Sequence, residues 1–356
     1  MIQLKVCWSL IFVSMLLLGQ PEQATGQQLR EVFQRVNPAV VVVHTEQETA
    51  LPELSNALPN RPLEPQGVGS GVLISADGKV LTAAHVVQTA DRIKVEFISG
   101  QVIPARVLAA VSFADIALLQ LEQVPPNAQV ARLGDSDQAA AGDQIFVVGA
   151  PYGIGHSLAS GYLSARRNAG RVYESLAALE VLQIDLAIYQ GNSGGPVFNL
   201  AGEVIGIVTH VLLGAGAANG PGFAVTSNVA RRLMLEEKRI WFGVEAMLLE
   251  GPLAEHFNLP QYAGLLVQSI ANGSLAGRLG LREGQLRATL GEQPQTQTIL
   301  LGGDIILEIQ GQQIRPVPTV LSAIEQTLNR LQASDRLTVK VLRAGKVVEL
   351  QAVIVE

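Results

Sequence analysis

The segment GNSGGPVF at 191–198 places three glycines and a proline around one serine. A serine hydroxyl is a weak nucleophile at neutral pH unless a general base takes its proton. The tetrahedral intermediate of acyl transfer carries an oxyanion, which backbone N–H groups stabilise when they are aimed at it. Glycines let a backbone curl tightly, so the N–H groups of Gly191 and Ser193 could meet at one point. The eight residues alone also fit a glycine-rich turn with an incidental serine.

A nucleophilic serine needs a base, and His85 is the best placed of the five histidines. It ends LTAAH, a predicted apolar strand terminus where two alanines leave room for an imidazole. Asp115 stands at the mouth of the apolar strand in FADIALLQL, where a carboxylate needs a hydrogen-bond donor such as an imidazole N–H. Each residue alone could be an ordinary strand-end residue. With Ser193 they follow one of the known triad orders, which predicts acyl transfer by a nucleophilic serine.

Short strands are predicted around these residues. Between Gly69 and Val225, runs of Val, Ile, Leu and Thr alternate with Gly, Asp, Pro and Asn, and Asp77-Gly78 is typical of a hairpin turn. Glycine accounts for 35 of the 356 residues, against a usual share of about 7%, which suits a chain with many turns. The pattern predicts an all-β pair of barrels or a sandwich.

The N-terminal segment 1–26 has the composition of a signal peptide. Its apolar run, Val6 to Gly19, is shorter than the ~20 residues of a membrane-spanning helix and fits a signal-peptide core. Ala24-Thr25-Gly26 supplies small residues for cleavage after Gly26. An uncleaved anchor and a buried helix remain alternatives. Cys7, the only cysteine, lies in this segment, so a processed chain would have no disulfide, no cysteine nucleophile and no thiolate metal site.

The C-terminal region and the charge pattern limit the remaining classes of function. Residues from about Trp241 onward mix strands with helices and predict a small α+β domain. The net charge of −6, without a dense basic stripe, argues against nucleic-acid binding. The histidines lack metal-ligand spacing and the chain has no phosphate-cradling loop, so we expect neither a metal nor another cofactor.

Three segments, TAAH, DIALLQL and GNSGGPVFNLAGEVIGI, resemble the trypsin-like serine proteases of the HtrA family, also called Deg or Do-like proteases. The spacings agree, with 30 residues from His85 to Asp115 and 78 from Asp115 to Ser193. YAGLLVQSIANGSLAGRLGL resembles the start of a PDZ domain. The resemblance extends from about residue 28 to the end. It implies an all-β double β-barrel (trypsin-like) protease domain over 27–240 and a small α+β PDZ domain over 241–356.

The resemblance assigns roles to individual residues. Ser193 would be the nucleophile, His85 the general base and acid, and Asp115 the orienting carboxylate, while Gly191 and Ser193 would supply the oxyanion amides. The implied protein is an exported, periplasmic serine endopeptidase that degrades unfolded or damaged proteins. It would form a homotrimer, with Phe33 packing between subunits, and would contact a membrane only if residues 6–19 were retained. The alternative is a proteolytically idle, chaperone-like or PDZ-mediated binding protein.

Substrate specificity follows less directly from the resemblance. Ile188 matches a wall of the primary pocket, and the segment after it that would flank the pocket and pair with substrate contains Thr209, His210 and Leu212. No acidic residue stands where a basic side chain would be captured, so we expect cleavage after small aliphatic residues. The pair Tyr189-Gln190 replaces the smaller or basic pair often seen before GNSGG, and His210 is unusual in its strand.

The resemblance also implies a peptide-binding site in the second domain. PDZ domains let an extended peptide join a sheet edge. Residues 265–270 match the receiving strand, although an ordinary strand with a glycine bulge is the alternative. The stretch 285–301 looks like an insertion, with a polar surface loop at 291–298. Peptide C-termini would be held by a loop formed by Tyr262, Ala263, Gly264 and Leu265.

Overall fold

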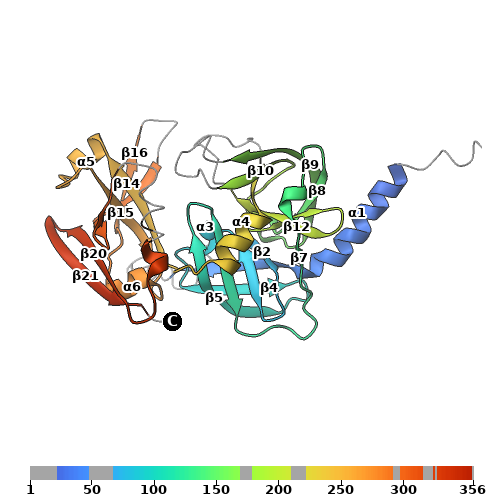
Figure 1. The fold of residues 1–356 in the computed structure, drawn as a ribbon, viewed down its shortest axis with the longest axis horizontal. Coiled ribbons are helices and arrows are strands. Elements are labelled where there is room, and N and C mark those ends of the chain that lie inside the picture. Colours follow the sequence, from blue (N-terminus) through green and yellow to red (C-terminus); the bar gives the residue numbers. More distant parts are fainter. Residues whose placement is uncertain are drawn as a thin grey trace, which may run out of the picture.

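The computed structural model describes residues 22–47, 67–168, 179–209, 222–291, 297–315, 324 and 327–354. Two bodies of strands lie side by side in the N-terminal part, a third lies beyond them, and helix α1 projects from the opposite end (Figure 1). Most of the predicted signal peptide lies outside the described residues. No described helix has the length and apolar character needed to cross a membrane.

The first barrel is a closed ring of six strands. Its β2–β3 turn is the predicted hairpin: Gly78 takes φ +92° and its N–H bonds the carbonyl of Ser75 at 3.2 Å. Strand β4 alternates exposed and buried residues, as expected of a strand with one face on a core. In ring order the strands are β1 (Val40–Glu46), β2 (Gly67–Leu73), β3 (Lys79–Thr82), β6 (Ile116–Leu121), β5 (Val102–Val111) and β4 (Arg92–Phe97).

The second barrel closes through the pairing of β11 with β12. The rings of Phe146 and Phe198 stack in its core with centroids 5.2 Å apart. With the first ring, this closure confirms the predicted double barrel. In order the strands are β11 (Pro196–Asn199), β8 (Gln144–Gly149), β9 (Ser157–Asn168), β10 (Glu180–Asp185), β13 (Gly222–Thr226) and β12 (Glu203–Thr209), with β7 (Arg132–Leu133) added outside β12.

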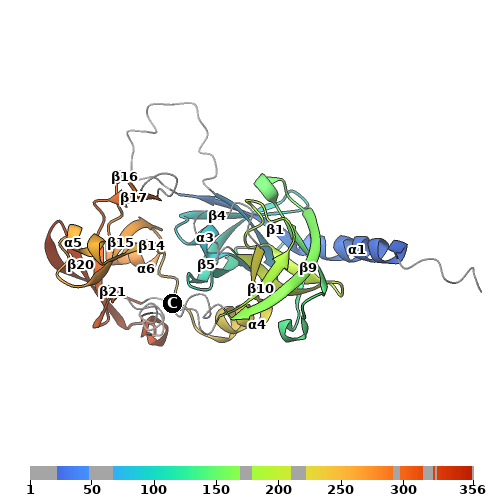
Figure 2. The ribbon, with the colours of Figure 1, turned by 90° about the horizontal axis from the view of Figure 1, so that it is seen from above.

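Helices precede and follow the strands of the two barrels in the chain. Helix α1 (Glu22–Val36) buries Val32 and Val36 against the barrel core, packs Phe33 against the same core, and extends away at its other end (Figure 2). Short 3₁₀ segments follow α1 and lie in two loops, η1 (Asn37–Ala39), η2 (Ser136–Gln138) and η3 (Pro151–Gly153). After β13 the chain continues as α4 (Ser227–Arg231) and a π-helical turn, η6 (Arg232–Glu236).

The C-terminal unit has its own core and sheet. The path of the sheet is β14 (Val244–Glu250), β15 (Ala263–Ile270), β18 (Ile305–Ile309), β20 (Arg336–Arg343) and β21 (Lys346–Val353), with β19 (Gln312–Gln313) on β18. Short helices α5 (Pro252–His256) and α6 (Leu275–Leu279) pack on it. Strands β16 (Leu286–Leu290) and β17 (Gln297–Leu301) form a separate hairpin, so the predicted polar loop at 291–298 is partly strand, and its residues 292–296 lie outside the described residues.

The predicted receiving strand is wrong. Leu265 pairs with Leu248 of β14 on one side and with Ile306 of β18 on the other. A strand whose N–H and C=O groups are used on both sides cannot accept a further strand. The two end strands of this sheet are β14 and β21, and neither directly follows the loop of Tyr262, Ala263, Gly264 and Leu265.

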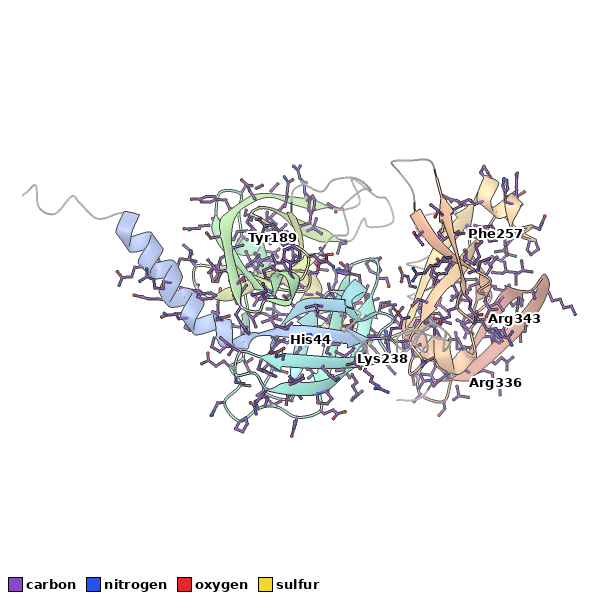
Figure 3. All side chains as sticks on the ribbon, turned by 180° about the vertical axis from the view of Figure 1, so that it is seen from behind. His44, Tyr189, Lys238, Phe257, Arg336 and Arg343 are labelled. Atoms are coloured by element: carbon purple, nitrogen blue, oxygen red, sulfur yellow. The ribbon has the colours of Figure 1, made fainter. Side chains whose placement is uncertain are left out.

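A buried ion pair stabilises the C-terminal unit. The Arg343 guanidinium donates from Nε and Nη2 to the two carboxylate oxygens of Asp304, each at 2.7 Å, and Asp304 is almost fully buried. Arg343→Met is expected to lower the free energy of unfolding of this unit by about 3–5 kcal/mol, because it leaves a buried carboxylate unpaired. Urea unfolding of the full chain checks this, with the exposed Arg336 changed to Met as the control (Figure 3). Equal losses in the two variants would contradict the expectation.

Candidate active site

The His85 ring and the Asp115 carboxylate meet at the rim of the first barrel. His85 lies in α3 (Ala84–Val87), a single helical turn just after β3, whereas the sequence predicted a strand end. Asp115 immediately precedes β6 and takes a φ of +49°, which is unusual for a non-glycine residue. His85 Nδ1 lies 2.8 Å from both carboxylate oxygens, and the His85 backbone N–H donates to Oδ1 at 2.9 Å. These contacts fix the ring and its carboxylate as one unit.

The environment keeps Asp115 ionised. Burial by itself raises the pKa of this carboxyl, but hydrogen bonds from the His85 ring, the Thr209 hydroxyl and the His85 backbone N–H together hold the pKa below its ordinary value. Thr209 Oγ1 donates to Oδ2 at 2.5 Å. Because an ionised carboxylate only accepts hydrogen bonds, Nδ1 of His85 carries the ring proton and Nε2 is left as a base.

The glycine-rich loop curls tightly where its backbone packs against the backbone of other segments. Gly191 and Gly194 have φ of +99° and +83°. A Cβ on Gly191 would overlap the carbonyl oxygen of Ala150, and one on Gly194 would overlap the carbonyl oxygen of Ser70. The N–H of Ser70 also donates to the Ser193 carbonyl at 2.8 Å. These two glycines therefore allow the serine loop to lie directly against the backbone of both barrels.

Two amides of this loop donate no hydrogen bond to any residue that the structure describes. Tyr152 N–H bonds the Gln190 carbonyl at 2.8 Å, and Gly195 N–H bonds the Asn192 carbonyl at 2.9 Å. In a trans peptide the N–H points opposite to the C=O, so the N–H groups of Gly191 and Ser193 point away from these contacts. Within the described part of the chain, neither N–H donates a hydrogen bond. Since buried N–H groups are rarely left unpaired, these two amides are available for an incoming oxygen.

The serine loop and the histidine helix both contact Gly69. A Cβ on Gly69 would lie 2.7 Å from Val86, the residue after His85, and 3.1 Å from the Ser193 carbonyl oxygen. The structure describes both Ser193 and His85 but no hydrogen bond between the serine hydroxyl and the ring. Such bonds are often long without substrate and shorten when substrate binds.

The structure describes two of the four residues that were predicted to contact substrate, Ile188 and Thr209. Ile188 packs against the second-barrel core and approaches Gly222. Thr209 is buried and its hydroxyl bonds Asp115, a role that the sequence prediction missed because it treated this residue as part of the substrate edge. His210 and Leu212 lie outside the described residues, so the predictions for them remain predictions.

Thr209→Val is expected to lower kcat/KM by about 10-fold, because the Asp115 carboxylate loses a charge-assisted hydrogen bond that keeps it ionised and oriented. Steady-state hydrolysis of a fluorogenic peptide checks this. Thr45→Val is the matched control, since Thr45 is also buried and donates to the Gly67 carbonyl in the first barrel. An unchanged kcat/KM in Thr209→Val would contradict the expectation.

The double barrel and this arrangement of side chains define a trypsin-like serine protease. The family described as "Trypsin-like peptidase domain" matches residues 69–207. The chain is 35% identical over 290 residues to the periplasmic pH-dependent serine endoprotease DegQ of Escherichia coli (strain K12), covering 77% of this chain and 63% of DegQ. It is 30% identical over 374 residues to a probable periplasmic serine endoprotease, DegP-like, of Pseudomonas putida (strain GB-1), covering 94% of this chain and 72% of that protein.

The chain therefore belongs to the HtrA family of serine endoproteases, which the DegP-like and DegQ relatives represent. It spans less than two thirds of the length of DegQ. Among solved structures, the HtrA-type protease AlgW with a tripeptide matches with a TM-score of 0.49 and 28% identity, covering 92% of this chain and 96% of that one.

Proposed function

We propose that the chain is an exported serine endopeptidase in which Ser193, His85 and Asp115 act as a catalytic triad. As Ser193 Oγ attacks the peptide carbonyl, His85 Nε2 takes the hydroxyl proton and Asp115 stabilises the resulting imidazolium. The carbonyl oxygen becomes an oxyanion and accepts hydrogen bonds from the Gly191 and Ser193 amides. His85 then gives its proton to the leaving amine, and water hydrolyses the acyl-enzyme by the same steps in reverse order.

One observation carries this proposal. Asp115 holds Nδ1 of His85, so Nε2 is the basic nitrogen. The serine loop, which contacts Gly69, presents one hydroxyl and two amides that have no partner among the described residues. A base, a nucleophile and oxyanion donors are the three parts that acyl transfer needs. They come from segments that are 30 and 78 residues apart in the chain, so local sequence does not explain their meeting.

The substrates that fit this proposal are unfolded or damaged polypeptides. An endopeptidase of this class needs an extended stretch of substrate, which unfolded chains offer. DegQ and the DegP-like relative are both named as periplasmic, which supports export to the periplasm. The apolar Ile188 beside Gly222 supports a primary pocket for small aliphatic side chains.

Residues 27–240 would then be the protease domain and 241–356 a PDZ domain with an insertion at 285–301. In support, the C-terminal sheet has its own core and ends in β14, an outer strand that an extended peptide could join. A homotrimer completes the proposal. The apolar side chains of Tyr152 and Ile154 are each 71% exposed, and a subunit interface would bury such groups.

Covalent labelling tests the proposed function directly. A fluorophosphonate should label the wild-type chain at Ser193 and should not label Ser193→Ala. Digestion of unfolded casein should likewise stop in Ser193→Ala, and the sequenced product termini should carry small aliphatic residues at the cleaved bond. A wild-type chain that neither labels nor digests would support the alternative of an idle binding protein.

A further inference from the structure

Ser70, on β2 of the first barrel, forms hydrogen bonds through its N–H, its carbonyl and its hydroxyl, and two of them go to the serine loop. The residue is fully buried. Its hydroxyl donates to the Gly191 carbonyl at 2.6 Å and accepts from the Ala150 N–H at 2.9 Å. Its N–H donates to the Ser193 carbonyl at 2.8 Å, and its own carbonyl accepts from the Thr82 hydroxyl at 2.7 Å. One residue of the first barrel thus contacts two segments of the second barrel.

Three successive peptide groups set the direction of the two oxyanion amides. The carbonyl of Gln190 is held by the Tyr152 N–H, and that of Asn192 by the Gly195 N–H. The middle peptide, between Gly191 and Asn192, is held at its carbonyl by Ser70 and at its N–H by the Tyr189 carbonyl. Ser70 supplies the only side chain among these contacts.

The middle peptide needs such a contact because it follows a glycine. Gly191 has no Cβ to limit rotation, and its φ of +99° is one that few other residues adopt. The Ser70 hydroxyl also holds Ala150, two residues before the Tyr152 N–H that orients the Gln190 carbonyl. The Ser70 hydroxyl therefore restrains the Gln190–Gly191 peptide in two ways. It binds the Gly191 carbonyl, and it holds the segment whose Tyr152 N–H binds the Gln190 carbonyl.

Ser70 also connects the loop to the segment that carries the base. Thr82, whose hydroxyl bonds the Ser70 carbonyl, is three residues before His85. The Ser193 carbonyl bonds the Ser70 N–H. Ser70 therefore links the loop of the nucleophile, Ser193, to the segment that leads into the base, His85.

We propose that Ser70 is a positioning residue for the reaction, whose hydroxyl holds the Gly191 and Ser193 amides in the direction that stabilises the oxyanion. This inference rests on the proposed function. The oxyanion exists in the transition state and not in bound substrate, so losing the hydroxyl should lower kcat and leave KM nearly unchanged. A residue that only stabilised the fold would lower the melting temperature and leave kcat per folded molecule unchanged.

The experiment compares Ser70→Ala with Ser227→Ala in the full chain. Ser227 is the matched control, because it is also fully buried and its hydroxyl donates to a backbone carbonyl, that of Gly134, at 2.9 Å. We expect Ser70→Ala to lower kcat on a fluorogenic peptide by about 10²-fold with KM within about 2-fold, on the scale of losing one oxyanion donor. Ser227→Ala should keep the wild-type kcat.

Inhibitor affinity gives a second readout. A peptide trifluoromethyl ketone forms a tetrahedral adduct with the nucleophile, whereas the unreactive peptide of the same sequence binds as ground state. Ser70→Ala should weaken the ketone by a factor close to its loss in kcat and leave the affinity of the unreactive peptide unchanged. If Ser70→Ala does not fold, Ser70→Cys, which keeps the volume with a weaker donor, should show the same selective loss of ketone affinity in smaller degree.

The outcomes separate the two proposals. An active wild type whose Ser70→Ala variant keeps kcat within 3-fold, or whose ketone and peptide affinities fall together, would overturn the positioning role alone. The same holds if Ser70→Cys has a wild-type ratio of ketone to peptide affinity. A wild-type chain that hydrolyses no peptide and takes no label at Ser193 would refute the proposed function, and this inference with it.

Discussion

His85→Ala is expected to lower kcat for peptide hydrolysis by about 10⁶-fold, because it removes the imidazole that takes the proton from Ser193 as it attacks. The structure gives the ring one orientation, with Nδ1 on Asp115, so the base cannot be supplied from another direction. KM should change little, since the ring contributes to the transition state more than to substrate binding. Steady-state kinetics with a fluorogenic peptide at high enzyme concentration measure both constants.

The double variant His85→Ala/Ser193→Ala makes this expectation sharper. Groups that act as one unit have non-additive effects, so the double variant should be about as slow as either single variant. Effects that multiplied would indicate that the two side chains act independently. His44→Ala is the control. His44 lies on β1 and pairs with Glu96 of β4 at 2.8 Å, so its replacement should leave kcat unchanged (Figure 3). Retention of more than about 1% of the wild-type kcat in His85→Ala would contradict the assigned base.

The side chains of this site that sequence could predict are those with a distinctive local setting. Ser193 lies among three glycines, and Asp115 is a carboxylate beside an apolar strand, so the local sequence alone marks each of them as unusual. Thr209 is a hydroxyl residue in an ordinary strand, and Ser70, although it lies between Gly69 and Gly71, has no neighbour in sequence that points to the serine loop. Their partners lie 121 and 94 residues away in the chain. Only the closed barrels bring these pairs together, and periodicity does not report long-range contacts.

Two predictions were wrong, the strand end at His85 and the receiving strand at 265–270, and their causes are related. Helix α3 has four residues, too few for a helical periodicity, so LTAAH looked like a strand end. Strand β15 was correctly predicted as a strand, but its place in the sheet was not. Five of its eight residues are buried, without the strict alternation that a strand with one exposed face would show. Edge or interior position is decided by pairing with β18, about 40 residues later in the chain.

Asp115→Asn is expected to lower kcat by about 10⁴-fold with little change in structure. The asparagine amide has nearly the same shape, but it can donate to Nδ1 of His85, which the carboxylate cannot. The ring then keeps its proton on Nε2, and that nitrogen can no longer accept the proton of Ser193. The loss should appear in kcat and in the rate of fluorophosphonate labelling. Asp77→Asn, at an exposed hairpin turn, should change neither.

The same variant tests the charge of Asp115 through stability in acid. The folded state holds the pKa of this carboxyl below its usual value of 3.8, against the effect of burial, through its hydrogen bonds to His85 and Thr209. The ionised carboxylate therefore stabilises the folded chain above that value, and this contribution is lost as the pH falls through the lower, folded-state pKa. Asp115→Asn removes the titrating group, so its free energy of unfolding should fall less steeply than that of the wild type below about pH 4. Parallel acid-unfolding curves for the two proteins, measured by urea titration at each pH, would show that the folded state does not stabilise Asp115 as an anion. The basis for placing the ring proton of His85 on Nδ1 would then be lost.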